Sequence, residues 1–167
     1  GLWYRSKHGT VVSNKVALFV RKGGSRHAGQ AALPQRNIQA QIEVLCALEA
    51  TRAEGAKRAL VQAATGVGKT CIAAFDSKPY ARVLFVAHRE EILNQAATTF
   101  HNIRNSDDYG FFRGADKCTD KSVIFASVMT LGKSEYLNEN YFARDYFDYI
   151  VIDEFHHAVN NPYRKIV

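Results

Sequence analysis

The sequence predicts an α/β domain in which a mostly parallel sheet is covered by helices on both faces. Apolar runs recur along the chain, among them ALVQAA, VLFVAH, SVIFAS and YIVI, with the composition of strands buried on both faces. Amphipathic stretches such as REEILNQAATTFHNI separate some of them. Strands that alternate with helices are typical of parallel sheets. The 167 residues, 47% hydrophobic and 23% charged, suffice for one domain with a sizeable core.

The chain divides into two parts. Residues 1–33 are expected to be an arm, a linker or the tail of a preceding domain, and residues 34–167 the α/β domain. In the arm, residues 11–20 resemble one or two strands, and residues 21–30 are basic, glycine-rich and loop-like. A helix is predicted to begin at Pro34, with apolar residues at helical spacing and a glycine near its end: Ile38, Ile42, Leu45, Leu48 and Gly55.

The remaining elements are predicted from the same patterns. Strands are expected at residues 59–64, 83–88, 109–113, 122–127 and 149–154, a helix at 89–103, a short helix and loop at 128–137, and a helical segment at 156–167. Two of these strands end in chemistry-bearing residues. The strand at 59–64 runs into a glycine-rich turn, and the strand at 149–154 ends in two carboxylates.

Composition narrows the functional classes. No apolar run approaches the roughly 20 residues of a membrane helix, and the N-terminus lacks the apolar stretch of a signal peptide. The three cysteines show no metal or redox spacing, which favours reduced thiols in a cytoplasmic protein. A net charge of +6 and a pI of about 9.3 fit a polyanionic partner, although many basic proteins bind none.

The turn AATGVGKT, from Ala63 to Thr70, has the residues of a phosphate-binding loop, except that Ala63 stands where the general pattern has its first glycine. Gly66 and Gly68 let the backbone turn sharply and approach an anion. Backbone N–H groups and the positive end of the following helix would face the same point. Lys69 would neutralise β- and γ-phosphate charge, and the Thr70 hydroxyl would bind Mg²⁺.

The stretch YIVIDEFHH places Asp153 and Glu154 directly after a buried strand. In phosphate-loop ATPases, a second strand ends in an acidic residue that holds Mg²⁺, usually through water. Asp153 fits that role, and Glu154 can polarise the attacking water. In a parallel sheet both strand ends open at the same edge, so each motif makes the other more credible.

Four stretches in order carry a family resemblance: ATGVGKT, LFVAHREEILNQA, FASVMTL and DEFH. In these stretches the sequence resembles the superfamily 2 helicases and translocases of the DExH branch, as motifs I, Ia, Ib and II. It is closest to the first RecA-like motor lobe of restriction-endonuclease-like DEAD/DEAH proteins of the type III Res subunit kind. The likeness covers roughly residues 34–167.

The resemblance implies ATP and Mg²⁺ as cofactors and assigns roles to particular residues. The nucleotide would be bound by Gln41, Thr65, Gly66, Val67, Gly68, Lys69 and Thr70, with Gln41 reading adenine. Gln39 in a shifted register, or a plain surface glutamine, remains the alternative. Asp153 and Thr70 would hold the metal, Glu154 the water, and His156 would couple the ATP site to nucleic acid.

The same resemblance implies a nucleic-acid partner, with DNA favoured over RNA. Arg89 would face the nucleic-acid backbone, or else be a solvated arginine at a helix start. Ser127 and Thr130 would add contacts near another helix start, or else act as a simple cap. Met129 departs from the glutamine that related sequences often carry there.

Two parts of the family pattern are missing from the sequence: motif III and an arginine-rich motif VI. We therefore expect a first motor lobe from a longer chain that also holds a second RecA-like lobe, and a lobe that is inactive alone. The motif III strand would lie between the phosphate-loop strand and the DExH strand. Its absence would leave a gap in the sheet unless another segment, such as one from residues 1–33, fills it.

Two other functions stay open. One is a phosphate-loop ATPase or kinase of another class, although the DEFH and VAHREE stretches count against it. The other is a nucleotide- or nucleic-acid-binding module without turnover, which would describe this fragment while the motor function describes its full-length parent. Nucleic-acid-stimulated ATP hydrolysis by the full-length protein would separate these alternatives.

Overall fold

The structure, a computed structural model, describes residues 16–22, 34–63, 67–133, 135–136, 141–143 and 145–153, and for 16–22, 34–37 and 63 the backbone only. Its strands are β1 (Val16–Lys22), β2 (Arg58–Ala63), β3 (Val83–Ala87), β4 (Tyr109–Arg113), β5 (Asp116–Lys117), β6 (Val123–Ser127) and β7 (Tyr149–Ile152). Its helices are α1 (Pro34–Ala53), α2 (Lys69–Asp76), α3 (Glu90–Arg104) and α4 (Val128–Leu131).

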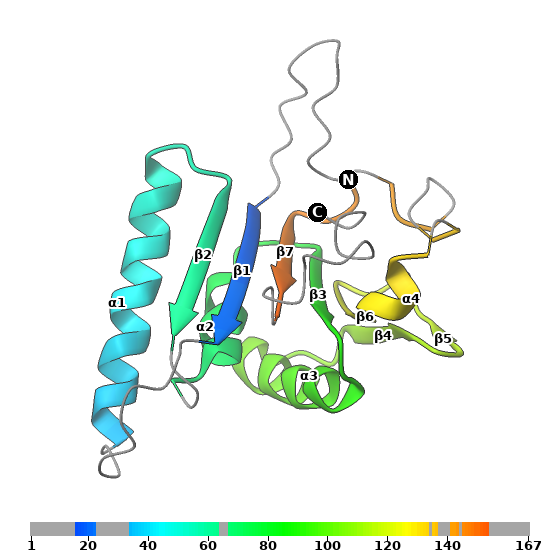
Figure 1. Cartoon of the computed structure of the whole chain (residues 1–167), viewed down its shortest axis with the longest axis horizontal. Helices are drawn as coiled ribbons and strands as arrows, with labels where there is room; N and C mark the ends of the chain where they lie inside the picture. Colours follow the sequence, from blue (N-terminus) through cyan, green and yellow to red (C-terminus); the bar gives the residue numbers. More distant parts are fainter. Residues whose placement is uncertain are drawn as a thin grey trace.

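The seven strands form one sheet in the order β2-β1-β7-β3-β6-β4-β5. Neighbouring strands run parallel, except that β5 pairs antiparallel with β4 at the edge. Figure 1 shows the arrowheads of β2, β1 and β7 at the same edge of the sheet. The predicted α/β architecture with a mostly parallel sheet is therefore confirmed.

The centre of the sheet differs from the expected gap between the phosphate-loop strand and the DExH strand. β1 lies in that position and pairs on one side with β2, from Ala17↔Arg58 to Lys22↔Ala63. On its other side β1 pairs with β7, from Val16↔Tyr149 to Phe19↔Ile152. Part of the N-terminal arm thus satisfies the backbone groups of both neighbours, and the described sheet has no gap there.

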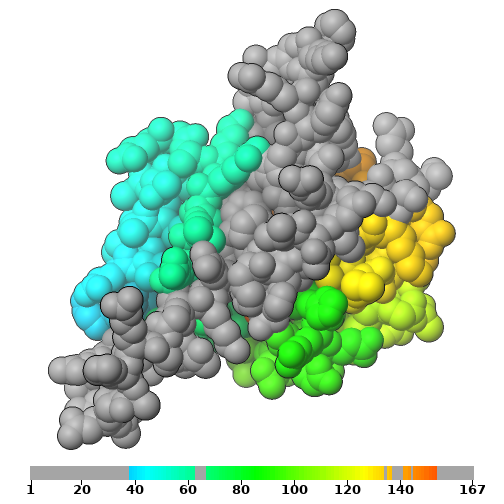
Figure 2. Space-filling view, in the orientation of Figure 1, coloured from blue at the N-terminus to red at the C-terminus, as the bar shows by residue number. Residues whose placement is uncertain are grey.

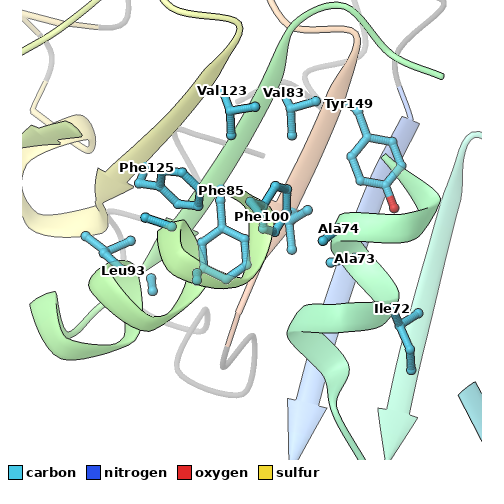
Figure 3. Packing of buried hydrophobic residues seen from close by; sticks show 14 of the residues in the cluster. Ile72, Ala73, Ala74, Val83, Phe85, Leu93, Phe100, Val123, Phe125 and Tyr149 are labelled. Atoms are coloured by element: carbon cyan, nitrogen blue, oxygen red, sulfur yellow. The ribbon is translucent and has the colours of Figure 1, made fainter. Parts of the chain in front are cut away.

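The first face of the sheet is covered by α1, α2 and α3. Aromatic side chains from the sheet and from α3 pack edge to face, with ring centroids 5.7 Å apart for Phe85 and Phe100 and 5.4 Å apart for Phe100 and Phe125. Figure 3 shows these rings beside the small residues of α2, Ala73 and Ala74, which let that helix approach the strands closely. The packing of α2 against this core fixes the position at which that helix begins.

The second face is covered by α4 and by Phe142, Tyr146 and Phe147. Its core consists of alternate residues of the central strands together with α4 and two phenylalanines: Leu84, Val86, Phe112, Ile124, Ala126, Val128, Leu131, Phe142, Phe147, Ile150 and Ile152. Both faces of β3, β6 and β7 are therefore buried, which explains why their sequences read as continuous apolar runs.

Helix α1 follows its predicted course but packs over only part of its length. Leu45 and Leu48 contact the core, whereas Ile38 and Ile42 are 56% and 48% exposed. The helix ends at Ala53, and Gly55, two residues on, has a φ of 88° that suits a left-handed cap. The cap is completed by N–H donation from Gly55 to Arg52 O (2.9 Å) and from Ala56 to Thr51 O (3.2 Å). In Figure 2, α1 (cyan) lies on the left of the view and the β4–β5 side (yellow-green) on the right.

Among the helices that the structure describes, none is both long and apolar enough to cross a membrane. The helical segment predicted at residues 156–167 lies outside the described residues.

Candidate functional site

The chemistry-bearing residues predicted from sequence gather where the parallel strands end. β2 ends at Ala63, before the glycine-rich turn, and β7 ends at Ile152, immediately before Asp153. β3 ends one residue before His88 and β6 ends at Ser127. Because these strands are parallel, all four ends lie at the carboxyl edge of the sheet, where ligands bind in open α/β sheets.

The phosphate loop is described from Val67 onward, while Thr65 and Gly66 lie outside the described residues. Gly68 caps α2 with φ 81° and ψ 45°, a left-handed conformation that glycine adopts without strain. The first N–H to close the helix is that of Ile72, which donates to Gly68 O at 3.1 Å. The helix dipole places its positive end at this first turn, next to the glycine-rich loop.

Gln41 joins α1 to this loop. Its side-chain Nε2 donates to Val67 O at 2.7 Å. A Cβ added at Gly68 would lie 2.5 Å from the same nitrogen, so the Gln41 side chain would have to move away from the loop. By contrast Gln39, the alternative in the sequence, is exposed and donates to Glu43 on its own helix at 3.2 Å. The structure thus brings Gln41 to the phosphate loop, and its contact with adenine stays a prediction.

The donor set at this edge fits a triphosphate and a magnesium ion. Half-buried Lys69 and Thr70 open α2 beside the left-handed Gly68, where an added Cβ would meet the Gln41 side chain. Half-buried Asp153 continues β7, and its N–H donates to Val86 O at 2.9 Å. Among the described residues no three His, Cys, Asp or Glu side chains form a metal cluster. Mg²⁺ typically needs only one or two carboxylates together with substrate phosphates and water, so this set is sufficient.

Glu154 and His156, the predicted water-polarising and coupling residues, lie outside the described residues. In the sequence Glu154 follows Asp153 directly, and His156 comes two residues after Glu154. Their roles stay predictions.

The three residues predicted to contact nucleic acid occupy different environments. Arg89 is exposed and precedes α3 in an extended conformation. Ser127 and Thr130 are only 7% and 9% exposed. The Thr130 hydroxyl accepts a hydrogen bond from Gly114 N at 3.3 Å, whereas neighbouring Met129 is 57% exposed. On α4 the exposed surface is therefore that of Met129, and the nucleic-acid contacts of all three predicted residues stay predictions.

A charged network that sequence reasoning missed lies at the opposite, amino edge. Asp76 at the end of α2 is 6% exposed and accepts two hydrogen bonds from Arg52, at 2.6 and 2.8 Å. Tyr149 at the start of β7 donates its hydroxyl to the same carboxylate at 2.6 Å. The hydrogen bond to Asp76 raises the pKa of Arg52, and burial raises the pKa of Tyr149. The network fastens α1 and α2 to β7, away from the carboxyl edge.

A second tie at the amino edge comes from Arg104, the last residue of α3. Its guanidinium donates to Ser77 O at 2.7 Å and to Tyr80 O at 3.1 Å, and burial lowers its pKa. These hydrogen bonds hold the loop after α2 against the end of α3, at the amino edge of the sheet.

Comparison with known proteins adds one match. The family described as type III restriction enzyme, res subunit, matches residues 36–167. No curated protein matches the chain.

Proposed function

The chain belongs to the family of the type III restriction enzyme res subunit, and from that membership, which makes it a helicase-like ATPase module, we propose that it is the ATP·Mg²⁺-binding lobe of a nucleic-acid-dependent motor. DNA is favoured over RNA as the track, in keeping with a restriction-type parent. A second RecA-like lobe in the same full-length chain completes the motor.

The observation that carries this proposal is the meeting of two strand ends. The loop that precedes Lys69 and the residue that follows β7, Asp153, open at one edge of one parallel sheet, separated only by β1. Adjacent strands lie about 4.8 Å apart, so β2 and β7 are separated by about 10 Å. A triphosphate with its metal is long enough to touch both.

Each residue at this edge has a chemical role in the proposal. Lys69 and the first-turn N–H groups bind the β- and γ-phosphates. A bound Mg²⁺ would supply positive charge to the transferring phosphates. Thr70 and Asp153 hold that ion. Glu154 orients the attacking water and takes its proton while the new bond to the γ-phosphorus forms and the bond to the ADP oxygen breaks. His156 links this site to bound nucleic acid.

Gln41 has two tasks in this account. Its amide bond to Val67 O holds the phosphate loop against α1. It also lies on the helix that borders the loop, where it reads the adenine ring. The first task rests on a described contact, and the second follows from the family resemblance.

Nucleic acid is proposed to run along the carboxyl edge on the side of β3 and β6. Arg89 supplies an exposed cation there, and Ser127 and Thr130 position the backbone of α4. The net charge of +6 supports a polyanionic track.

The proposed lobe includes part of the N-terminal arm, because residues 16–22 belong to its sheet, while the rest of the division into residues 1–33 and 34–167 is kept.

The lobe alone is proposed to bind ATP without useful turnover. Phosphoryl transfer in the two-lobed ATPases uses an arginine from outside the first lobe. In other phosphate-loop enzymes such an arginine raises the rate on the order of 10³–10⁵-fold. Closure of a second lobe also excludes water and gives the nucleotide state a mechanical readout.

The experiment is nucleic-acid-stimulated ATP hydrolysis by the full-length parent, compared with its Glu154→Gln variant. We expect DNA to raise the wild-type rate, and the variant to bind ATP·Mg²⁺ but hydrolyse it about 10²–10⁴ times more slowly. Turnover that needs a small-molecule phosphate acceptor instead of DNA would favour a kinase of another class. Binding with no turnover under any condition would favour a module without catalysis.

A further inference from the structure

Arg113, the last residue of β4, ties that strand to the first turn of α3. Its Nη1 donates to Asn94 Oδ1 at 2.8 Å and to Glu90 O at 3.5 Å. The guanidinium lies over the ring of Phe111, 4.0 Å from the ring centroid, and its Nε is 3.9 Å from Oδ2 of Asp116. The side chain is only 17% exposed. Held on several sides in this way, it fixes the first turn of α3 relative to the end of β4.

The residue after Arg113 ties the same strand end to α4. Gly114 has a φ of 47°, and its N–H donates to Thr130 Oγ1 at 3.3 Å. The ammonium of Lys117 donates to Gly114 O across the turn. Because β4 and β6 are parallel, this turn lies at the carboxyl edge of the sheet, where α3 and α4 both begin. The Arg113–Gly114 turn therefore connects the first turn of α3 with α4.

This connection bears on Arg89 because the start of α3 has no side-chain cap of its own. Arg89 is the N-cap residue, in an extended conformation, and its side chain makes no capping hydrogen bond. The backbone bond from Leu93 N to Arg89 O measures 3.3 Å, which is long for a helix. Among the described side-chain hydrogen bonds, those that join this turn to the sheet come from Arg113. One of them reaches Glu90 O, on the residue next to Arg89.

We propose that Arg113 is a positioning residue for the nucleic-acid track, which holds Arg89 at a fixed place relative to α4 so that both helices meet one strand together. This deepens the proposed function and rests on its placement of Arg89, Ser127 and Thr130 along the track. A phosphate contact from a long, exposed side chain gains affinity when the backbone beneath it is already fixed, because less ordering remains to be done on binding.

The chemistry of the guanidinium sets the test variants. A planar guanidinium donates in a fixed fork and stacks on a ring at the same time, whereas the ammonium of lysine is a flexible point charge. Arg113→Lys therefore keeps the charge and removes the tie. Asn94→Ala removes the acceptor instead, at an exposed helix position where alanine favours the helix, so this variant should fold. The matched control is Arg104→Lys, because Arg104 ties the other end of α3 to Ser77 O and Tyr80 O.

The experiment measures binding of a fluorescently labelled single-stranded DNA to the full-length parent by anisotropy, over a range of salt concentrations. Arg89→Ala is the reference, since losing one phosphate contact reduces the slope of log affinity against log salt by about 0.7 for a single strand. We expect Arg113→Lys and Asn94→Ala each to weaken binding about three- to tenfold and to reduce that slope as Arg89→Ala does. In the Arg89→Ala background, either change should have little further effect, because the contact that it positions is already gone. Arg104→Lys should leave DNA affinity and slope unchanged.

The cycle with Arg89 separates positioning from two other roles of Arg113. A purely structural tie would lower the free energy of unfolding and leave DNA affinity and slope as in the wild type. A direct phosphate contact would add to the effect of Arg89→Ala and would not respond to Asn94→Ala. Either pattern would overturn the inference, and the proposed function would stand if Arg89→Ala still weakens binding. Unchanged binding in Arg89→Ala would overturn the inference together with the proposed Arg89 contact, and a parent that binds no DNA would overturn the proposed function itself.

Discussion

Gly68→Ala tests whether the described shape of the phosphate loop is the one that binds nucleotide. Gly68 has φ 81°, and an L-residue held in the left-handed region costs about 1–2 kcal/mol. The new Cβ would also lie 2.5 Å from Nε2 of Gln41, so the amide must leave Val67 O, which costs about 1 kcal/mol for the broken hydrogen bond. The unbound variant can relax out of this shape, so nucleotide binding in it carries the whole sum, about 2–3 kcal/mol, which corresponds to a roughly 30- to 150-fold loss of affinity.

The assay is calorimetric titration of ATP·Mg²⁺ into wild type, Gly68→Ala, Gln41→Ala and the double variant. Gln41→Ala removes the hydrogen bond to Val67 O, so it should lower affinity at least about fivefold, with the proposed adenine contact adding to that loss. In the double variant the clash is absent, and the remaining loss relative to Gln41→Ala reports the backbone strain alone. Binding by Gly68→Ala within about threefold of wild type would refute the reasoning, because the loop would then bind nucleotide in some other shape.

Three further outcomes follow from the amino edge and from α3. Asp76→Ala should lower the free energy of unfolding by about 3–5 kcal/mol in a denaturant titration, because Arg52 and the buried Tyr149 hydroxyl lose their partner; a decrease below about 1 kcal/mol would show that the network is dispensable. The pKa of Tyr149 is raised in the folded state, so its contribution to the free energy of unfolding is complete below the unfolded pKa of about 10. Above that pH the contribution falls by about 1.4 kcal/mol per pH unit. Tyr149→Phe should flatten this alkaline decline in stability, and an unchanged slope would exclude Tyr149 as its source. Arg89→Ala should weaken DNA binding about equally for all sequences and reduce its salt dependence by roughly one phosphate contact, whereas a sequence-selective loss would place Arg89 elsewhere.

The strands and most helices are predictable from sequence because their patterns are local. The sequence predicts β4 (Tyr109–Arg113) with its observed ends, and β3, β6 and α3 within one or two residues. These segments are apolar at successive positions or at helical spacing, and the flanking residues cannot continue the pattern. Element type follows from such periodicity without knowledge of the neighbours.

The position of β1 is not fixed by its own residues. A short apolar stretch predicts a strand but not its partners, and the pairing of Phe19 with Leu60 and with Ile152 depends on which slot in the sheet is open. The expectation that residues 1–33 can fill the central gap depends on counting strands against the family pattern. The structure confirms that a segment of residues 1–33 fills the central position, and the expected gap between β2 and β7 is therefore absent from the described sheet.

Other features depend on distance in three dimensions. Asp76 lies 24 residues from Arg52 and 73 from Tyr149, so no local pattern marks the network. Ile38 and Ile42 satisfy helical spacing but are exposed, because periodicity identifies an apolar face and not the extent of the surface that covers it. The bond from Gln41 to Val67 likewise spans 26 residues; sequence resemblance singles out Gln41, and its contact with the loop emerges only from the fold.

The central claim, that the carboxyl edge between β2 and β7 binds ATP, is tested most directly by titrating ATP·Mg²⁺ into residues 1–167 and into their Lys69→Ala variant. Lys57→Ala is the matched control, because it removes an equal charge at the amino end of β2. We predict saturable binding with one site in wild type and control, and loss of most of that affinity in Lys69→Ala, since the charge that faces the β- and γ-phosphates is gone. Equal ATP affinity in all three folded proteins would contradict the assignment of this edge as the nucleotide site.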